Sequence, residues 1–495
     1  MTKRSWKRTF GFVGLLVLGW ALLLIPSEPP PDFPPGKKAP FIWNRDAYWS
    51  RLEKEFDRLR SSDCDSLAAG TAGSFDEVAR LVGECERGRL SPDDGIFDRV
   101  EDGFFRLAVP SAVCPDYLPE YVGLFGRLRT AVKEQSRHWD LNEAAARNRL
   151  YRLLYGGRTA VEEVMLQASG REIPDVVAGA EEPSATPAAE ILGVKIHSGD
   201  ILVSRGGAPT SALIARGNDY PGNFSHVALA HVEAETGKVS IIESHIEIGV
   251  AVADIDDYLR DTKLRVMVLR LRSDLPFMCE DPMLPHRAAT FALERARREH
   301  IPYDFAMDFE EPSKLFCSEV VSNAYARFGV TLWTGLSHIS TPGVKNWLAS
   351  FGVKNFITQE PSDLEYDPQL KVVAEWRDFE TLRRDRLDNA VVDVMLESAE
   401  RGEKLDYDWY MLPAGRLAKA YSAALNLFGK VGPVPEGMDA AAALRNEWFS
   451  ERHRRIKKGL TESAERFERE RGYFPPYWEL VKQARQAEAA LRDDG

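Results

Sequence analysis

Several features that are common in metal- and nucleotide-dependent proteins are missing from this 495-residue sequence. It has no CxxC pair and no histidine-rich ligand spacing, which argues against a structural zinc site. It also lacks an HExxH pattern, a phosphate-binding glycine loop and an internal repeat of fixed period. Basic residues are in deficit, 64 against 76 acidic ones, and the net charge of −12 argues against a general nucleic-acid binder. We therefore expect no metal, no organic cofactor and no nucleic-acid partner.

Cysteine is scarce, with five in the whole chain. In an oxidising compartment Cys64, Cys85, Cys114 and Cys279 could form up to two disulfides, and the sequence leaves their pairing open. Cys317 would then stay free.

Cys317 is the cysteine whose surroundings suggest chemistry. The residues after it recur at helical spacing and end at Gly329, which predicts a helix that begins at or near Cys317. Unpaired N–H groups and the positive end of a helix dipole favour a thiolate, so we expect a pKa below the usual value of about 8.5. The alternative is a buried structural cysteine.

Two polar residues upstream offer the partners that a nucleophilic thiol needs. Short β-rich runs bounded by turn residues predict a small sheet over residues 200–204, 226–230, 239–243 and 264–270. His226 begins one run and could accept the thiol proton, and Glu243 ends a neighbouring run and could orient the imidazole. The plainer interpretation is a core histidine and a solvated carboxylate.

Two other histidines compete for the role of base. His231 is an odd number of residues from His226, so it is expected on the opposite face of the strand. His245 is expected to lie beyond the end of the strand that carries Glu243. A metal site built from His226, Glu243, His245 and Cys317 is a more distant alternative.

The ordered set of motifs resembles a known family. The relevant segments are Gly199–Ser204 (GDILVS), Phe224–Leu229 (FSHVAL), Ile242–Glu243, Tyr303–Phe305 (YDF), Leu315–Val321 (LFCSEVV) and Ser340–Gly343 (STPG). Together they resemble the permuted papain-like amidases of the YiiX/YaeF type, relatives of the NlpC-type peptidases in which histidine precedes cysteine. The resemblance covers about residues 190–350.

The resemblance implies an α+β fold, with a small antiparallel sheet and a helix that carries the nucleophile. It also implies Cys317 as nucleophile, His226 as base and Glu243 as the residue that orients the histidine. Tyr303 resembles a tyrosine near the oxyanion site, although a core aromatic is an equal alternative. Glu319, in the first helical turn, is expected only to complement the helix dipole.

The implied activity is a thiol hydrolase that cleaves an amide bond, of a peptide or of peptidoglycan type, or an ester bond through an acyl-enzyme. An acyltransferase or lipid thioesterase would use the same residues. The apolar side chains of Phe224, Phe305, Leu315 and Phe316 mildly favour an acyl or lipid-like substrate, or are ordinary core. A catalytically silent scaffold that binds a lipid or peptide is the alternative from another class.

The N-terminus predicts export. Four basic residues between Lys3 and Arg8 precede nearly unbroken apolar or small residues from Phe10 to Ile25, and no Ala-x-Ala cleavage site follows. We expect an uncleaved anchor in the membrane, with the body on the extracytoplasmic, periplasmic side. The sequon Asn223–Ser225 adjoins His226, and a glycan there would crowd the site, which favours a bacterial compartment.

The remaining chain divides into predicted regions by composition. After the anchor (1–25) come a proline-rich spacer (26–40) expected to lift the body off the bilayer, a helical region (41–173) and a linker (174–189). The catalytic domain is expected over 190–362 and a helical region over 363–495. Two apolar stripes, Trp49 to Leu59 and Tyr121 to Val132, are expected to be packing faces, and the basic cluster Arg452–Lys458 a solvated helix face.

Overall fold

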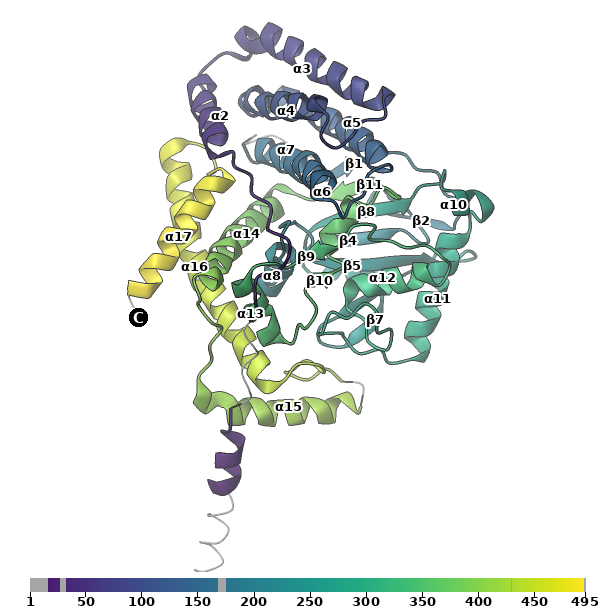
Figure 1. Cartoon of the computed structure of the whole chain (residues 1–495), viewed down its shortest axis with the longest axis vertical. Helices are drawn as coiled ribbons and strands as arrows, with labels where there is room; N and C mark the ends of the chain where they lie inside the picture. The colour runs from purple at the N-terminus through teal and green to yellow at the C-terminus, as the bar shows by residue number, and fades with distance from the viewer. Residues whose placement is uncertain (1–16, 27–32, 168–174, 429, 494–495) are drawn as a thin grey trace, which may run out of the picture.

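An antiparallel sheet of seven strands lies at the centre of the computed structural model, which describes residues 17–26, 33–167, 175–428 and 430–493 (Figure 1). The strand order is β1-β11-β8-β4-β5-β6-β7. The strands are β1 (Val176–Ala178), β4 (Ile201–Gly206), β5 (His226–Val232), β6 (Val239–His245), β7 (Gly249–Asp254), β8 (Lys263–Leu271) and β11 (Leu370–Trp376). Mixed helix and antiparallel sheet agree with the α+β class predicted from the sequence.

The period-two pattern of the central strands gives the sheet two buried faces. Val203, Val227 and Met267 face α11 (Leu284–Arg298) and α12 (Cys317–Ala326), where they form one apolar core. Leu202, Ala228 and Val268 face the other way and pack under the hairpin of β2 (Ala188–Ile191) and β3 (Val194–His197). Burial on both sides explains why these strands read as continuous apolar runs.

Helices from the N-terminal region stand at the β1 side of the sheet. They are α2 (Asp46–Leu59), α3 (Cys64–Arg87), α4 (Gly95–Val113), α5 (Leu118–Ser136), α6 (Ala144–Leu150) and α7 (Gly156–Gln167). The predicted stripe from Tyr121 to Val132 is buried along α5. A disulfide joins Cys64 at the start of α3 to Cys114 just after α4, and Cys85, Cys279 and Cys317 are free.

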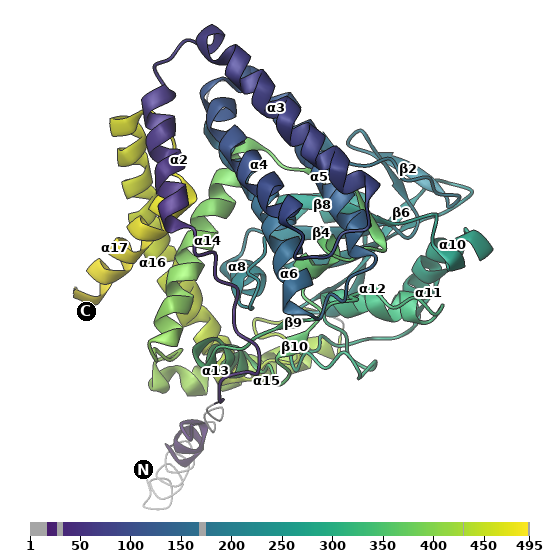
Figure 2. The same ribbon diagram turned by 45° about the horizontal axis from the view of Figure 1, so that its top comes forward.

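The C-terminal helices are α14 (Phe379–Glu400), α15 (Leu412–Asn426), α16 (Ala440–Arg471) and α17 (Tyr477–Asp493). Figure 2 shows α14 beside α16 and α17, and α14 also contacts β8. Part of the basic cluster Arg452–Lys458 lies between these helices: Arg452 pairs with Glu488 at 3.1 Å and Lys457 with Asp388 at 2.6 Å. The prediction of a solvated face therefore holds for only some of its residues.

The sheet extends beyond the predicted catalytic range of 190–362. β11 lies C-terminal to it and pairs with β8, and β1, within the predicted linker, pairs with β11. A three-residue strand in a segment rich in proline and glutamate has no periodic pattern of its own, because its pairing partner is almost 200 positions away in sequence. Other α-helices and strands are α8 (Pro209–Arg216), α9 (Ile255–Arg260), α10 (Pro276–Glu280), β9 (Ser337–His338), α13 (Pro342–Phe351) and β10 (Ile357–Thr358).

The part of the proline-rich spacer that the structure describes, residues 33–40, does not stand free. The Gly36 N–H donates to the Ser340 carbonyl at 2.7 Å, and Lys345 Nζ donates to the Pro34 carbonyl at 3.2 Å. These bonds hold residues 34–36 against the body instead of lifting the body away. Residues 27–32 of the spacer lie outside the described residues.

Only the end of the predicted anchor is described. Residues 17–23 are helical, and residues 1–16 lie outside the described part of the chain. Across the ranges that the structure does describe, no helix combines the length and apolarity that crossing a bilayer requires. The membrane anchor stays a prediction from the sequence.

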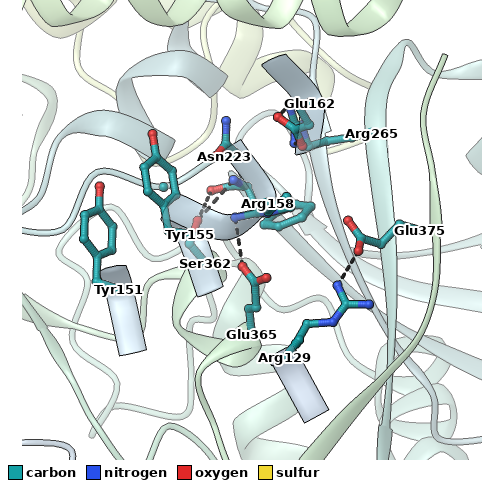
Figure 3. A network of polar contacts seen from close by, with 12 residues as sticks. Arg129, Tyr151, Tyr155, Arg158, Glu162, Asn223, Arg265, Ser362, Glu365 and Glu375 are labelled. Atoms are coloured by element: carbon teal, nitrogen blue, oxygen red, sulfur yellow. Dashed lines mark hydrogen bonds and ion pairs between the residues drawn. The ribbon is translucent and has the colours of Figure 1, made fainter. Parts of the chain in front are cut away.

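A buried ionic network attaches the helices to the sheet (Figure 3). Arg265 of β8 forms ion pairs with Glu162 of α7 and Asp385 of α14, and all three side chains are buried. Arg158 of α7 pairs with Glu365 at 2.8 Å, and Arg129 of α5 pairs with Glu375 of β11. Burial alone would raise the pKa of Glu162, but the surrounding guanidinium groups, Arg265 first, lower it to about 2.

We predict that Arg265→Met lowers the free energy of unfolding by about 3–5 kcal/mol, because two buried carboxylates lose their closest counter-ion and keep only more distant guanidinium groups, such as Arg386 for Glu162 and Arg205 for Asp385. Urea denaturation at pH 7 measures the change. Arg260→Met is the matched control, since Arg260 pairs with Asp257 on the exposed surface of α9, where loss of a pair costs about 1 kcal/mol or less.

The loss of stability in Arg265→Met should depend on pH. The lowered pKa of Glu162 means that its contribution to stability is present above its ordinary pKa of 4.5 and disappears as pH falls through about 2. The two proteins should therefore converge in stability in acid. Equal stability of the two proteins at pH 7 would contradict the role given to Arg265.

Candidate active site

The register of two neighbouring strands brings the predicted base and its orienting residue together. His226 is the first residue of β5, and Ala228 of β5 pairs with Glu243 of β6. His226 and Ala228 point to the same face because they are two residues apart, so Glu243 shares that face with His226. The outcome is a hydrogen bond of 2.7 Å between His226 Nε2 and Glu243 Oε2.

The predicted nucleophile lines the same cavity as the predicted base. Cys317 is the first residue of α12, and a cavity of about 720 Å³ is lined by Cys317, His226, His245 and Tyr303. Glu243 lies behind His226 and is buried. The structure thus brings three of the four predicted site residues to one cavity and joins the fourth to it through a hydrogen bond.

The sulfur of Cys317 lies close to the start of β5. Its Sγ is 4.0 Å from the carbonyl oxygen of Ser225, the residue before His226. Among the described residues no hydrogen bond joins Sγ to the His226 ring. The thiol and the imidazole line the same cavity without a direct hydrogen bond between them.

Burial dominates the electrostatics of the thiol. It raises the pKa of Cys317 to about 12, while N–H groups of Val227 and Ser318 oppose the rise only in part. The expectation of a lowered pKa was wrong, because the desolvation of a buried sulfur outweighs the helix N-terminus on which that expectation relied. The resting group is a neutral thiol at neutral pH.

The imidazole and carboxylate have the charges that a base and its partner need. Burial lowers the pKa of His226, although its hydrogen bond to Glu243 opposes the effect. Burial would raise the pKa of Glu243, but hydrogen bonds from His226 and His245 hold it well below its usual value. A neutral His226 that uses Nε2 to donate to an ionised Glu243 keeps Nδ1 as the acceptor.

His245 is more involved than the sequence suggested. Strand β6 extends through His245, which shares its face with Glu243 by period-two spacing, and the prediction that it lies beyond the strand was wrong. His245 Nε2 lies 3.1 Å from Glu243 Oε1. Burial lowers the pKa of His245, but this hydrogen bond and the negative charge of Glu243 together raise it above its usual value. The Glu-x-His spacing was the signal that could have revealed this. His231, by contrast, stacks on His286 with ring centroids 5.2 Å apart.

The ligand atoms of His226, Glu243 and His245 lie within 4.8 Å of one another and could hold a metal ion. Both Nε2 atoms already face a carboxylate oxygen at hydrogen-bond distance. A metal ion bound to both Nε2 atoms would have to displace the two imidazole protons that form these hydrogen bonds. The cluster therefore satisfies its own polar atoms as two imidazole–carboxylate pairs.

Tyr303 lines the cavity with Cys317, and burial raises its pKa well above the usual value. Its hydroxyl makes no hydrogen bond within the described part of the chain, so it is free to meet a ligand. Glu319 accepts a hydrogen bond from the Phe316 N–H at 2.7 Å and closes the first turn of α12. Burial raises the pKa of Glu319 to about 9, so it is not the plain dipole partner that was expected.

The prediction of an apolar cavity wall needs correction, because none of the four residues on which it rested, Phe305 included, lines the cavity. Phe224, Leu315 and Phe316 are buried core residues and do not line the cavity, so they do not favour an acyl substrate. The cavity instead takes Arg384 from α14, Pro435 and Met438 from the segment before α16, and Asn446 and Ser450 from α16. No local pattern in the C-terminal region signals this contact.

Comparison with known proteins identifies the segment that carries the site. Residues 195–374 match the family model described as permuted papain-like amidase enzyme, YaeF/YiiX, C92 family. The match confirms the resemblance inferred from the ordered motifs, over about a third of the chain. No curated protein and no solved structure matches the chain.

We predict that iodoacetamide alkylates Cys317 slowly at pH 7 and that the rate climbs with pH through 9 without a plateau, because only the thiolate reacts and the pKa is raised to about 12. Peptide mass spectrometry follows the rate. Exposed Cys279 is an internal reference in the same sample, and it should react first. A rate plateau for Cys317 below pH 8 would contradict a buried neutral thiol.

Proposed function

We propose, from the match of residues 195–374 to the permuted papain-like amidases and from the geometry of the site, that this protein is a cysteine hydrolase. The observation that carries the proposal is the His226–Glu243 hydrogen bond on a cavity into which Cys317 opens. Cys317 is the nucleophile, His226 the base and Glu243 the group that orients the imidazole. The bond cleaved is an amide, of a peptide or of peptidoglycan type, or an ester.

Because the resting thiol is neutral, proton transfer accompanies attack. His226 Nδ1 takes the Cys317 proton while the sulfur bonds to the substrate carbonyl carbon. The imidazolium then gives the proton to the leaving amine or alkoxide, and a thioester remains on Cys317. Water, deprotonated by His226, hydrolyses the thioester and restores the thiol. Glu243 stabilises the imidazolium in both halves of the cycle.

Tyr303 and the N-terminus of α12 would stabilise the negative charge that forms on the substrate during the reaction. The backbone N–H of Cys317 is at the first position of a helix, where it has no partner within the helix. Together with the free hydroxyl of Tyr303, it would meet the negative charge that develops on the carbonyl oxygen. The raised pKa of Tyr303 keeps that hydroxyl protonated and able to donate.

We also propose that the protein works on the extracytoplasmic side of a membrane to which its N-terminal segment anchors it. The basic residues before the apolar run of residues 10–25 support this orientation. The Cys64–Cys114 disulfide gives independent support, because such bonds persist in oxidising compartments.

We predict that His226→Ala lowers kcat about 10²–10⁴-fold, the usual range for loss of a general base. His245→Ala should cost less, because His245 acts on the reaction through Glu243. His231→Ala on the same strand, whose ring stacks on His286, is the matched control and should keep full activity. The acid limb of kcat/KM should lie below pH 6.5, because burial lowers the pKa of His226.

The assay for these variants separates the rival activities. A panel of peptidoglycan fragments, peptide amides and acyl-lipid esters is incubated with the protein, and the products are identified by mass spectrometry. Release of free acid shows hydrolysis, whereas an acyl group moved to a second molecule shows the alternative, an acyltransferase. A larger loss from His245→Ala than from His226→Ala would reverse the assignment of the base. The absence of turnover and of any Cys317 adduct would favour a silent binding scaffold.

We predict that removal of metal ions leaves the activity intact, because the proposed cycle uses only a thiol, an imidazole and a carboxylate. Activity is measured after dialysis against EDTA and again after addition of Zn²⁺. Loss on dialysis and recovery with Zn²⁺, together with a stoichiometric metal content that His245→Ala abolishes, would show that His226, Glu243 and His245 form a metal centre instead.

A further inference from the structure

Helix α15 exposes an unusual amount of apolar surface. Leu417 and Tyr421 are 55% and 59% exposed, and Leu427 and Phe428, just after the helix, are 85% and 79% exposed. Trp409, just before the helix, is 66% exposed. The spacing of 417, 421 and 424 places the side chains of Leu417, Tyr421 and Ala424 along one face of the helix. Soluble surfaces rarely gather large apolar side chains in this way, so the face calls for an occupant.

The opposite face of α15 packs against the body of the protein. Leu412 packs with Ala440 and Ala441 of α16, and the Ser422 hydroxyl accepts a hydrogen bond from the Val434 N–H at 2.9 Å. The helix therefore has a fixed orientation on the body. The exposed apolar face is held outwards by packing.

The charged side chains of the helix and of the residues next to it are basic, and the nearest acidic residues in sequence are Asp408 before the segment and Glu436 after it. Residues 409–435 contain Arg416, Lys419 and Lys430 but no aspartate or glutamate, in a chain whose net charge is −12. A helix that has an exposed apolar face with a tyrosine, is preceded by a tryptophan and carries basic residues of its own, is typical of segments that lie in the interface of a bilayer with anionic lipids.

The N-terminal apolar segment ends on this helix. Arg416 donates hydrogen bonds to the carbonyl oxygens of Leu23 at 2.8 Å and Ile25 at 2.6 Å. In both views residues 17–23 project from the body beside α15, and α15 lies across that end of the molecule (Figures 1 and 2). If the apolar run of residues 10–25 enters a membrane, this contact leaves no spacer between the bilayer and α15.

We propose that the apolar face of α15, extended by Trp409, Leu427 and Phe428, lies in the headgroup region of the membrane that holds the N-terminal segment. The occupant of this face is lipid. Trp409 and Tyr421 sit at the level where amphipathic rings are favoured, and Lys430 meets anionic headgroups. The proposal goes beyond the hydrolase assignment and shares with it only the N-terminal anchor.

The docked helix packs directly behind residues that line the cavity. Ala418 on α15 packs against the cluster of Val434, Met438 and Ala442, and Met438 lines the catalytic cavity. Lys419 Nζ donates to the Pro435 carbonyl at 2.7 Å, and Pro435 lines the cavity as well. Membrane contact on α15 is therefore one layer of side chains away from the cavity that holds Cys317.

Depth-dependent quenching tests the proposal on the full chain. In a Cys279→Ser background, which removes the exposed free thiol, Leu417→Cys and Leu427→Cys are labelled with an environment-sensitive fluorophore. Leu192→Cys is the matched control, since Leu192 is also an exposed leucine but lies in the β2–β3 turn, away from α15. The proteins are reconstituted in vesicles of phosphatidylcholine and phosphatidylglycerol, with or without brominated acyl chains.

The expected result is blue-shifted emission and several-fold stronger bromine quenching at positions 417 and 427 than at 192. Flotation of the vesicles reports separately whether the anchor holds the chain. Flotation with labels on α15 that behave like the control overturns the proposal, and so does failure to float. Shielding of these labels that depends on protein concentration and not on bromine would assign the face to a second copy of the chain and overturn it too. Hydrolysis by Cys317 in detergent is unaffected by these outcomes, so the two proposals fail separately.

Discussion

The ion pairs of Arg265 with Glu162 and Asp385 are the constraint on which the arrangement of the whole molecule depends. Arg265 lies on β8, Glu162 on an N-terminal helix and Asp385 on a C-terminal helix, so one guanidinium connects three regions that are far apart in sequence. A buried charge without a partner is costly, which makes the docked position of both helices much more favourable than any displaced one. With α14 in place, α16 and the segment before it reach the cavity beside Cys317.

Within the site, the balance between burial and hydrogen bonding decides which groups carry charge. Glu243 has two imidazole partners and stays ionised despite its burial. Cys317 has only weak polar partners, and its burial keeps the thiol neutral. For the proposed hydrolysis, a neutral thiol, a neutral imidazole and an ionised carboxylate would favour attack with simultaneous proton transfer over a preformed thiolate–imidazolium pair.

The balance between solvation and contacts within the protein also explains how charged and apolar side chains are distributed on the surface. Along most of the described chain, basic side chains find acidic partners, as Arg452 and Lys457 do between α16 and its neighbours. On α15 the two basic residues, Arg416 and Lys419, donate to backbone carbonyls and form no ion pair with any described residue, and Leu417 and Tyr421 are exposed. This contrast within one chain is the physical reason to assign α15 to an anionic, partly apolar environment.

The sequence by itself determined the local features: the helix that begins at Cys317, the strands of His226 and Glu243, and the order of motifs that identifies the family. These follow from periodicity and residue type within short windows. Only the tertiary structure decided that β1 and β11 join the sheet, that His245 shares Glu243, that burial outweighs the helix dipole at the thiol, and that a C-terminal segment lines the cavity. Each of these depends on strand register, desolvation or contacts between residues distant in sequence, and none of those quantities exists before the chain has folded.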